Sequence, residues 1–226
     1  MTDSNRWAAR KLLRAGRVGS LATSAGGHPF VSLVTPATAP DLSILLLLSD
    51  LSEHTRHLRQ DPRCAVLVAG AAAEANPQTI PRVTVVGVAE PTEVAALKER
   101  YLAIHPYAAL YAGFADFHLW RIRVESASFV GGFGRAARFT GVQFSPDPGA
   151  VAAVAGAEAA IGDEWNRGES DVRARMVGQT GDWRLVAVDV DGCDLRSDER
   201  VIRIHWKTQV ANAAGVRKEM SGFVMP

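Results

Sequence analysis

The 226-residue sequence contains little cysteine and no long apolar run. Its two cysteines, Cys64 and Cys193, do not make a disulfide framework, and no CxxC or Cys/His spacing indicates a zinc site. The apolar run at residues 44–48 is far shorter than the roughly 20 residues that a membrane-spanning helix needs. Residues 1–14 are polar and charged, without the apolar centre of a signal peptide. These absences predict a reduced cytoplasmic protein without a membrane span.

The sequence also lacks an excess of charge of either sign. Lys and Arg number 25 and Asp and Glu 24, so the net charge is +1 and no large field attracts nucleic acid or an anionic membrane. The composition, 47% hydrophobic and 22% charged, is typical of a globular chain and excludes disorder and collagen-like repeats. GxSxG, P-loop and HExxH motifs are absent. We therefore expect a globular protein that binds neither nucleic acid nor a membrane.

Short strands separated by turn residues dominate the first part of the chain. Their predicted ranges are 18–23, 30–38, 42–48, 64–68, 82–89 and 118–124. Helices are predicted at about 3–15, 49–60 and 92–104, the first ending at Gly16 in a left-handed conformation. Hairpin turns with few helices favour a closed antiparallel barrel. Because residues 42–48 form a nearly unbroken apolar run, we expect a strand buried on both faces, and we expect two chains to pair through the barrel.

A change in composition near residues 145–149, which read SPDPG, predicts a linker. It would separate a barrel domain, residues 1–145, from a small α+β domain, residues 146–226. The predicted elements of the second domain are helices from about 150, at 163–177 and at 208–222, and strands at 185–190 and 201–206. Asp191-Gly192 would form the hairpin turn between these two strands.

One segment places several hydroxyl groups where a helix begins. Residues 48–57 read LSDLSEHTRH and follow the buried strand. Free main-chain N–H groups and the helix dipole make such a helix start a potential anion site. The side chains that would add donors for a phosphate are Ser49, Ser52, Thr55 and Arg56. A plain helix cap involving Asp50 and Glu53 explains the same polarity without a ligand, so the pattern alone leaves both interpretations open.

Other candidate residues give weaker signals. Arg82 begins a predicted strand, where it could contact a phosphate or the edge of a flavin ring, or be no more than an exposed charge at a strand end. His54 and His57 lie three residues apart, a spacing that can place two imidazoles on one helix face. No third and fourth ligand are evident nearby, so a metal site is not predicted.

Short motifs, taken in order, carry a family likeness. They are GSLAT at residues 19–23, GHP at 27–29, Ser32, SEHTRHL at 52–58 and DPR at 61–63. Together they resemble the pyridoxamine 5′-phosphate oxidase-related FMN-binding split-barrel family. Five further motifs are similar to the heme-utilisation branch of that family: PRVT at 81–84, HP at 105–106, YAGF at 111–114, DF at 116–117 and GGFGRA at 131–136. VDVDGCDL at 188–195 resembles the small α+β domain that often follows the barrel in this branch.

The resemblance implies a mainly β fold: a six-stranded antiparallel split barrel with a small C-terminal α+β domain. It also implies a homodimer that binds FMN between its protomers, which makes a flavin-dependent oxidoreductase the expected function. Carried over by position, the residues on the phosphate side would be Ser49, Ser52, His54, Thr55 and Arg56. Ser32 and Val34 would border the flavin, and Arg82 would add a further contact.

Two alternatives use the same scaffold: a heme-binding or heme-degrading protein, and a cofactor-free binding module. Heme would need an apolar slot, a cation such as Arg135 for a propionate and an axial histidine. Glu53 and His54 stand where flavin-binding members carry an Arg-Lys pair. Residues 164–169 read EWNRGE where related small domains often carry two histidines, and no histidine follows His205. We therefore expect no heme or metal ligand in the second domain.

Overall fold

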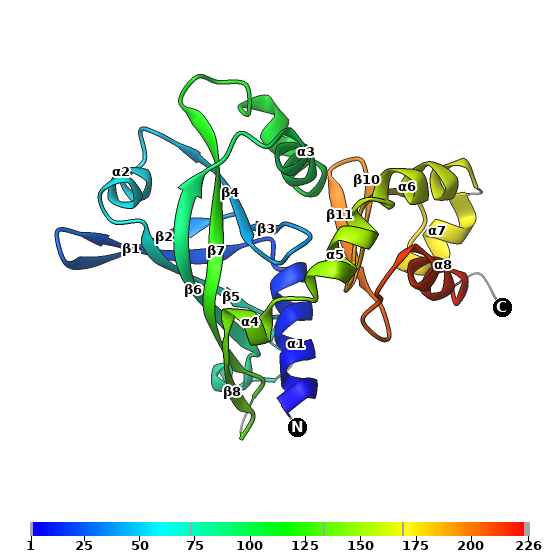
Figure 1. Ribbon diagram of the computed structural model, residues 1–226, viewed down its shortest axis with the longest axis horizontal. Helices are drawn as coiled ribbons and strands as arrows, with labels where there is room; N and C mark the ends of the chain where they lie inside the picture. Colours follow the sequence, from blue (N-terminus) through cyan, green and yellow to red (C-terminus); the bar gives the residue numbers. More distant parts are fainter. Residues whose placement is uncertain (1, 73, 133, 169, 224–226) are drawn as a thin grey trace. The chain divides into compact units, whose positions relative to one another are not determined.

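The chain divides into two compact units (Figure 1). The computed structural model describes residues 2–72, 74–132, 134–168 and 170–223. The first unit comprises Met1–Tyr101 and Ala108–Ser145, and the second comprises Leu102–Tyr107 and Pro146–Pro226. Among the described residues, no helix is both long and apolar enough to cross a lipid bilayer.

The first unit is built on a large antiparallel sheet. Among the described residues this sheet has eight strands in the order β2-β1-β5-β6-β7-β4-β3, with β8 paired to β7. The strands are β1 (Gly19–Ala25), β2 (His28–Val34), β3 (Ala37–Thr38), β4 (Ile44–Ser49), β5 (Arg63–Ala69), β6 (Arg82–Pro91), β7 (Phe117–Val130) and β8 (Ala136–Thr140). Every pair along this path is antiparallel, as the sequence predicted.

The strand count differs from the expected six for two reasons. Residues 30–38 do not form one strand, because β2 ends at Val34 and the chain re-enters the sheet as β3, which pairs with β4. Pro36 lies in the break and has no N–H to donate to a ladder. The other added strand is β8, which pairs with the second half of the 14-residue strand β7. Strand β7 therefore continues beyond the predicted end at residue 124.

Among the described residues, four α-helices accompany the sheet, although residues 102–104 at the end of the third helix belong to the second unit. They are α1 (Thr2–Ala15), α2 (Glu53–Gln60), α3 (Ala95–Ile104) and α4 (Gly141–Phe144), with short 3-10 turns at Pro77–Thr79 and Pro106–Leu110. Helix α1 ends as predicted, but Gly16 is not in the left-handed region. A Cβ atom at Gly16 would lie 2.4 Å from Cγ1 of Val68. This glycine is therefore required for close packing between the end of α1 and β5, and the predicted left-handed cap was wrong.

The core of the first unit lies where the apolar run predicted it. Ile44, Leu46 and Leu48 pack with buried side chains of β5, β6 and β7, and Val83 and Val85 belong to the same cluster. Leu45 and Leu47, which point to the other face of β4, are buried as well. The predicted burial of this strand on both faces is thus confirmed and is achieved within a single chain.

The second unit holds a three-stranded antiparallel sheet of order β11-β10-β9 among the described residues. Its elements are α5 (Pro148–Ala155), α6 (Glu158–Arg167), α7 (Ser170–Val177), β9 (Arg184–Asp189), β10 (Gly192–Ser197), β11 (Arg200–His205) and α8 (Ala213–Ser221). The predicted two-stranded hairpin lacked β10, and the predicted helix at 163–177 is broken near Gly168, which has extended backbone angles. Glu169 and Phe133, which belong to motifs noted above, lie outside the described residues.

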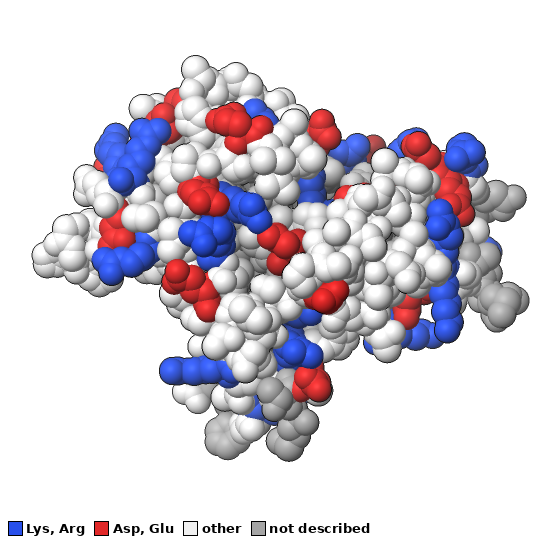
Figure 2. Space-filling model, in the orientation of Figure 1, with Lys and Arg blue, Asp and Glu red and all other residues white. Residues whose placement is uncertain are grey.

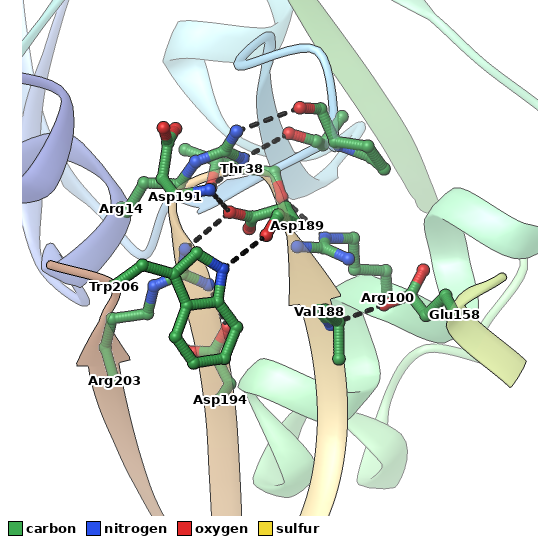
Figure 3. A network of polar contacts seen from close by, with 12 residues as sticks. Arg14, Thr38, Arg100, Glu158, Val188, Asp189, Asp191, Asp194, Arg203 and Trp206 are labelled. Atoms are coloured by element: carbon green, nitrogen blue, oxygen red, sulfur yellow. Dashed lines mark hydrogen bonds and ion pairs between the residues drawn. The ribbon is translucent and has the colours of Figure 1, made fainter. Parts of the chain in front are cut away.

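Strand β10 escaped prediction because its polar side chains are neutralised internally. Arg203 of β11 donates hydrogen bonds to Asp189 at 2.6 Å and to Asp194 at 2.8 Å (Figure 3). All three side chains are at most 3% exposed. The indole of Trp206 donates to the main-chain oxygen of Asp189 at 3.0 Å. A strand with buried, paired charges shows no apolar alternation, so its sequence resembles a loop.

Candidate functional site

A pocket of about 280 Å³ is lined by residues of β2, β4, α2 and β7. We call it the His54 pocket. Its walls are mostly apolar, and its lining residues are Leu33, Val34, Thr35, Leu46, Leu47, Leu48, Ser49, Ser52, His54 and Phe117. The pocket therefore combines the end of the buried strand β4 with the beginning of α2, the junction at which the sequence predicted a site.

The hydroxyl groups at this junction hydrogen-bond to neighbouring groups of the same chain. The Ser49 hydroxyl donates to Asp116 at 2.6 Å. The Ser52 hydroxyl donates to the main-chain oxygen of Ser49 at 2.7 Å and lies 2.7 Å from the hydroxyl of Thr55, which is fully buried. Although Ser52 is the residue before α2, its side chain makes no capping bond to the helix. These contacts stabilise the turn and place the Asp116 carboxylate close to the expected phosphate position.

Arg56 does not line the His54 pocket. Its guanidinium forms an ion pair with Glu53 at 2.6 Å, and the two side chains are 53% and 58% exposed. This is an ordinary pair between residues three apart on a helix surface. No Lys or Arg appears in the pocket lining among the described residues. In this conformation the pocket has no cation with which to hold a phosphate dianion.

His54 is the titratable side chain that the pocket presents. Its Nδ1 lies 3.0 Å from the hydroxyl of Ser32, which comes from β2. Burial lowers the pKa of the His54 imidazole, and the neighbouring His57 lowers it further. The ring is therefore neutral at pH 7. Because Ser32 engages Nδ1, and Nε2 has no partner among the described residues, the ring is oriented with one nitrogen available as a ligand.

Arg82 lies far from these residues within one chain. It pairs with Val130 at the end of β7, whereas Ser49 pairs with Phe117 at the start of that strand. Its guanidinium donates to the main-chain oxygens of Gln78 and Ile80, both at 3.1 Å. Arg82 also lines a separate pocket of about 520 Å³ together with Arg135 and the glycine-rich segment that contains Gly132 and Gly134. The two predicted contact regions are thus distinct in a single chain.

The eight predicted site residues fall into three groups. Val34, Ser49, Ser52 and His54 line the His54 pocket. Ser32 and Thr55 hydrogen-bond to residues of that lining, whereas Arg56 and Arg82 lie elsewhere. Sequence reasoning placed Val34 at the site but missed the rest of the apolar wall and Asp116. The DF sequence at residues 116–117, part of the family resemblance, was the available signal for Asp116 and Phe117.

In the second unit, Glu164 belongs to the segment 164–169, where related small domains often carry histidines. Glu164 forms an ion pair with Arg217 at 2.9 Å, with both side chains about half exposed. Within the described ranges of both units, no three His, Cys, Asp or Glu side chains are grouped to hold a metal ion. On the face shown in Figure 2, basic and acidic side chains are interspersed.

A family model described as "CREG, beta-barrel" matches residues 3–145. This match covers more than half of the chain, so the chain belongs to the CREG β-barrel family. The Arabidopsis thaliana protein "Non-canonical heme oxygenase HOZ, chloroplastic" is 32% identical over 133 residues, which are 56% of this chain and 40% of that protein. The chain thus matches about two fifths of the length of this relative.

Two solved structures resemble nearly the whole chain. The protein Atu2129 of Agrobacterium tumefaciens, described as of unknown function, has 25% sequence identity and a TM-score of 0.79, covering 97% of this chain and 94% of its own. A heme-binding protein from Mycobacterium smegmatis has 27% identity and a TM-score of 0.59, covering 99% of this chain and 96% of its own.

Proposed function

We propose that this member of the CREG β-barrel family binds heme at the His54 pocket, where Nε2 of His54 would hold the iron. The observation that carries the proposal is a neutral imidazole held by Ser32 in an apolar pocket, which is the form of histidine that ligates iron. Two relatives with heme in their names support the choice of cofactor, one of them similar over almost the whole chain. The heme-utilisation branch indicated by the sequence motifs agrees with it.

The residues present fit the group chemically. The apolar side chains of β2, β4 and β7 suit a porphyrin, and His54 supplies a nitrogen ligand. Bound heme would supply one-electron or O₂ chemistry, while the protein supplies binding and orientation. A porphyrin is larger than a pocket of about 280 Å³, so part of it would extend past Leu33, which is 72% exposed at the pocket wall.

Titration of the purified protein with hemin tests this proposal. We expect the wild type to give a saturable Soret shift, and His54→Ala to bind at least about tenfold more weakly, because an iron–nitrogen bond is lost. Added imidazole should restore the wild-type spectrum. His28→Ala is the matched control, because His28 is exposed at the first position of β2 and does not line the His54 pocket. An unchanged spectrum in His54→Ala would exclude this ligand, and a folded wild type that binds no hemin would exclude the function.

FMN is the second candidate, and the hydroxyl cluster of Ser49, Ser52 and Thr55 at the start of α2 favours it. It would require Arg56 to leave Glu53 and turn toward the phosphate. If so, Arg56→Ala combined with Ser52→Ala should weaken FMN binding by about 2–4 kcal/mol, since charge-assisted hydrogen bonds are the strong ones. Absorbance bands typical of flavin in the purified protein would favour FMN. If the protein bound neither FMN nor heme when each was added, a cofactor-free binding module would be favoured.

We also propose that the protein is a homodimer that pairs through the outer face of the sheet. Four apolar side chains on that face of β2, β5 and β6 are exposed: Val31 at 62%, Leu33 at 72%, Leu67 at 37% and Val86 at 42%. The strand register aligns them across β1, because Leu33 pairs with Ser20 and Ser20 with Leu67. The self-complementary contact of a two-fold dimer would cover such a face.

A dimer of this kind would bring the His54 pocket of one chain close to Arg82 of the other. Arg82 lies two residues before Thr84 and four before Val86 on β6, so it faces the same side of the sheet as Val86. A second chain on that face could therefore meet both Leu33 and Arg82. Sedimentation at micromolar concentration should show a dimer for the wild type and a monomer for Leu33→Glu. The control is Leu110→Glu, at a residue that is 80% exposed outside the sheet. A monomeric wild type would contradict the proposal.

A further inference from the structure

The Asp116 carboxylate is held beside the polar end of the His54 pocket. Ser49 and Ser52 form this end, between the end of β4 and the start of α2. Two hydrogen bonds fix Asp116 there. The main-chain N–H of Asp50 donates to its main-chain oxygen at 2.8 Å, and the Ser49 hydroxyl donates to its side chain at 2.6 Å. The turn that the sequence predicted to bind a phosphate therefore binds a carboxylate of the same chain.

The hydroxyl protons of this turn are already used. Ser49 Oγ accepts the main-chain N–H of Leu51 at 3.1 Å and directs its own proton to Asp116. The Ser52 hydroxyl donates to the main-chain oxygen of Ser49 at 2.7 Å, and the main-chain N–H of Ser52 donates to the same oxygen at 3.1 Å. Because a hydroxyl has a single proton, a ligand oxygen at Ser49 would receive a hydrogen bond only by displacing the carboxylate.

No cation compensates the charge of Asp116. Its side chain has no ion-pair partner in the described part of the chain. The arginines of α2 are engaged by other carboxylates. Arg56 pairs with Glu53 at 2.6 Å, and Arg59 pairs with Asp50 at 2.6 Å. Asp116 therefore adds an uncompensated negative charge at the polar end of the pocket.

A phosphate group is the kind of ligand group that this arrangement opposes. A phosphate monoester carries a charge of about −1.5 to −2 at pH 7. A phosphate oxygen that contacted Ser49 would lie within about 6 Å of the Asp116 carboxylate, since each hydrogen bond is no longer than about 3 Å. The helix dipole offers only about half a positive charge at the start of α2, too little to neutralise both anions. A ligand without a phosphate meets no such repulsion.

We propose that Asp116 is a specificity-determining residue, which selects against phosphorylated ligands so that the His54 pocket accepts flat ring systems in their phosphate-free form. This inference rests on the proposed function for the choice of the His54 pocket as the ligand site, and heme, which has no phosphate group, satisfies it. The selection acts through charge, because Asp116 is held beside the pocket by Ser49 and does not itself line it.

Riboflavin and FMN are suitable probes, because they differ only in the phosphate group. Quenching of flavin fluorescence on titration with the protein measures the affinity for each. We expect the wild type to bind FMN no more tightly than riboflavin. Asp116→Asn removes the charge but keeps an oxygen that can accept the Ser49 hydroxyl. This variant should bind FMN about tenfold more tightly than the wild type and riboflavin unchanged, since only the phosphate is repelled by the carboxylate.

Two further variants separate the charge of Asp116 from its structural contacts. Asp116→Glu retains the charge and should retain the wild-type order of affinities. Asp61→Asn removes a carboxylate at the other end of α2, outside the pocket lining, and should change the affinity for neither flavin. If Asp61→Asn gained as much FMN affinity as Asp116→Asn, any loss of negative charge would suffice, and the proposal would be overturned.

The proposal is also overturned if the wild type binds FMN more tightly than riboflavin, or if Asp116→Asn gains equally for both flavins. The same holds if Asp116→Asn binds FMN no better than the wild type, including the case in which neither binds it. Hemin titration of the same proteins separates this result from the proposed function. No hemin binding together with a gain in FMN affinity would exclude the heme function and leave the role of Asp116. Hemin binding without that gain would do the reverse.

Discussion

Each unit encloses polar side chains, but these side chains have different partners in the two units. In the second unit, Arg203 reaches two aspartates and is almost wholly shielded from solvent. In the first unit, His54 has one nitrogen engaged by Ser32 and the other without a partner among the described residues. The Arg203 guanidinium is paired with opposite charges of its own unit, so it contributes to the stability of the fold. The His54 imidazole is oriented by one hydrogen bond and has a second nitrogen that a ligand can use.

The electrostatics of the two places reinforce this contrast. Burial opposes the charge of Arg203, but Asp189 and Asp194 more than compensate and raise the pKa of its guanidinium. For His54 burial and a second histidine act in the same direction, and both lower the pKa. The second unit therefore retains its buried charges, while the pocket of the first keeps its histidine neutral. We infer that the second unit contributes stability and the first contributes chemistry.

The largest effect is expected from breaking the buried charges of the second unit. Arg203→Met leaves Asp189 and Asp194 buried without their cation, which should cost about 3–5 kcal/mol of unfolding free energy. Urea denaturation monitored by tryptophan fluorescence measures this change. Trp206 is buried beside the ion pairs and donates to the main-chain oxygen of Asp189, so its fluorescence should change when the second unit unfolds.

The matched control for this variant is Arg217→Met. Arg217 pairs with Glu164 at the surface, and its side chain is 46% exposed. Solvent screening makes such a pair worth about 0–1 kcal/mol. Equal loss of unfolding free energy in the two variants would mean that the buried Arg203 pairs stabilise the protein no more than an exposed pair does. The stabilising role given to the second unit's buried charges would then be wrong.

A smaller effect, on hemin affinity, is expected from removing the hydroxyl that orients the His54 ring. Ser32→Ala takes away the hydroxyl beside Nδ1, and loss of such a supporting contact typically lowers the affinity of a ligated cofactor by about tenfold or more. Hemin titration should show weaker binding than in the wild type, but tighter binding than in His54→Ala. Ser32→Thr retains a hydroxyl and should restore most of the affinity. If Ser32→Ala and Ser32→Thr behaved alike, the hydroxyl would have no role in orienting the ring.

The elements that sequence reasoning found are those with a strong local signal. The apolar run of β4 and the alternating residues of β6 are buried as predicted, because their patterns reflect burial directly. Strand β10 was missed because its side chains do not alternate clearly between apolar and polar, whereas β8 does alternate but is only five residues long. β8 pairs with residues of β7 that lie 6 to 14 positions earlier, and the ion pairs that support β10 join residues 9 and 14 positions apart. Neither kind of contact is visible in the apolar pattern of the strand itself.

The candidate site shows the same limit. Ser52 was placed at the site because it follows a buried strand where a helix begins, and His54 was placed there by position from the family resemblance. The contact between His54 and Ser32 joins residues 22 positions apart and arises only when β2 packs near α2. Arg56 has a suitable charge, but it faces solvent and pairs with Glu53. Composition indicates which groups are available, whereas their direction is set by the fold.

The smallest effect is expected where a charge pair lies at the surface, as a third case beside Arg203 and His54. Asp61 accepts two side-chain hydrogen bonds from Arg63, at 2.9 and 2.7 Å, which lower the pKa of its carboxyl from 3.8 to about 2. A carboxyl whose pKa is lower in the folded than in the unfolded protein stabilises the fold above the unfolded value, and loses this contribution as the pH falls through the folded value. Asp61→Asn should therefore be slightly less stable than the wild type above about pH 5. The two stability curves, measured by urea denaturation from pH 7 downward, should converge between the unfolded pKa of 3.8 and the folded value of about 2. A constant difference over this range would show that the aspartate acts through its position at the end of α2 and not through its charge.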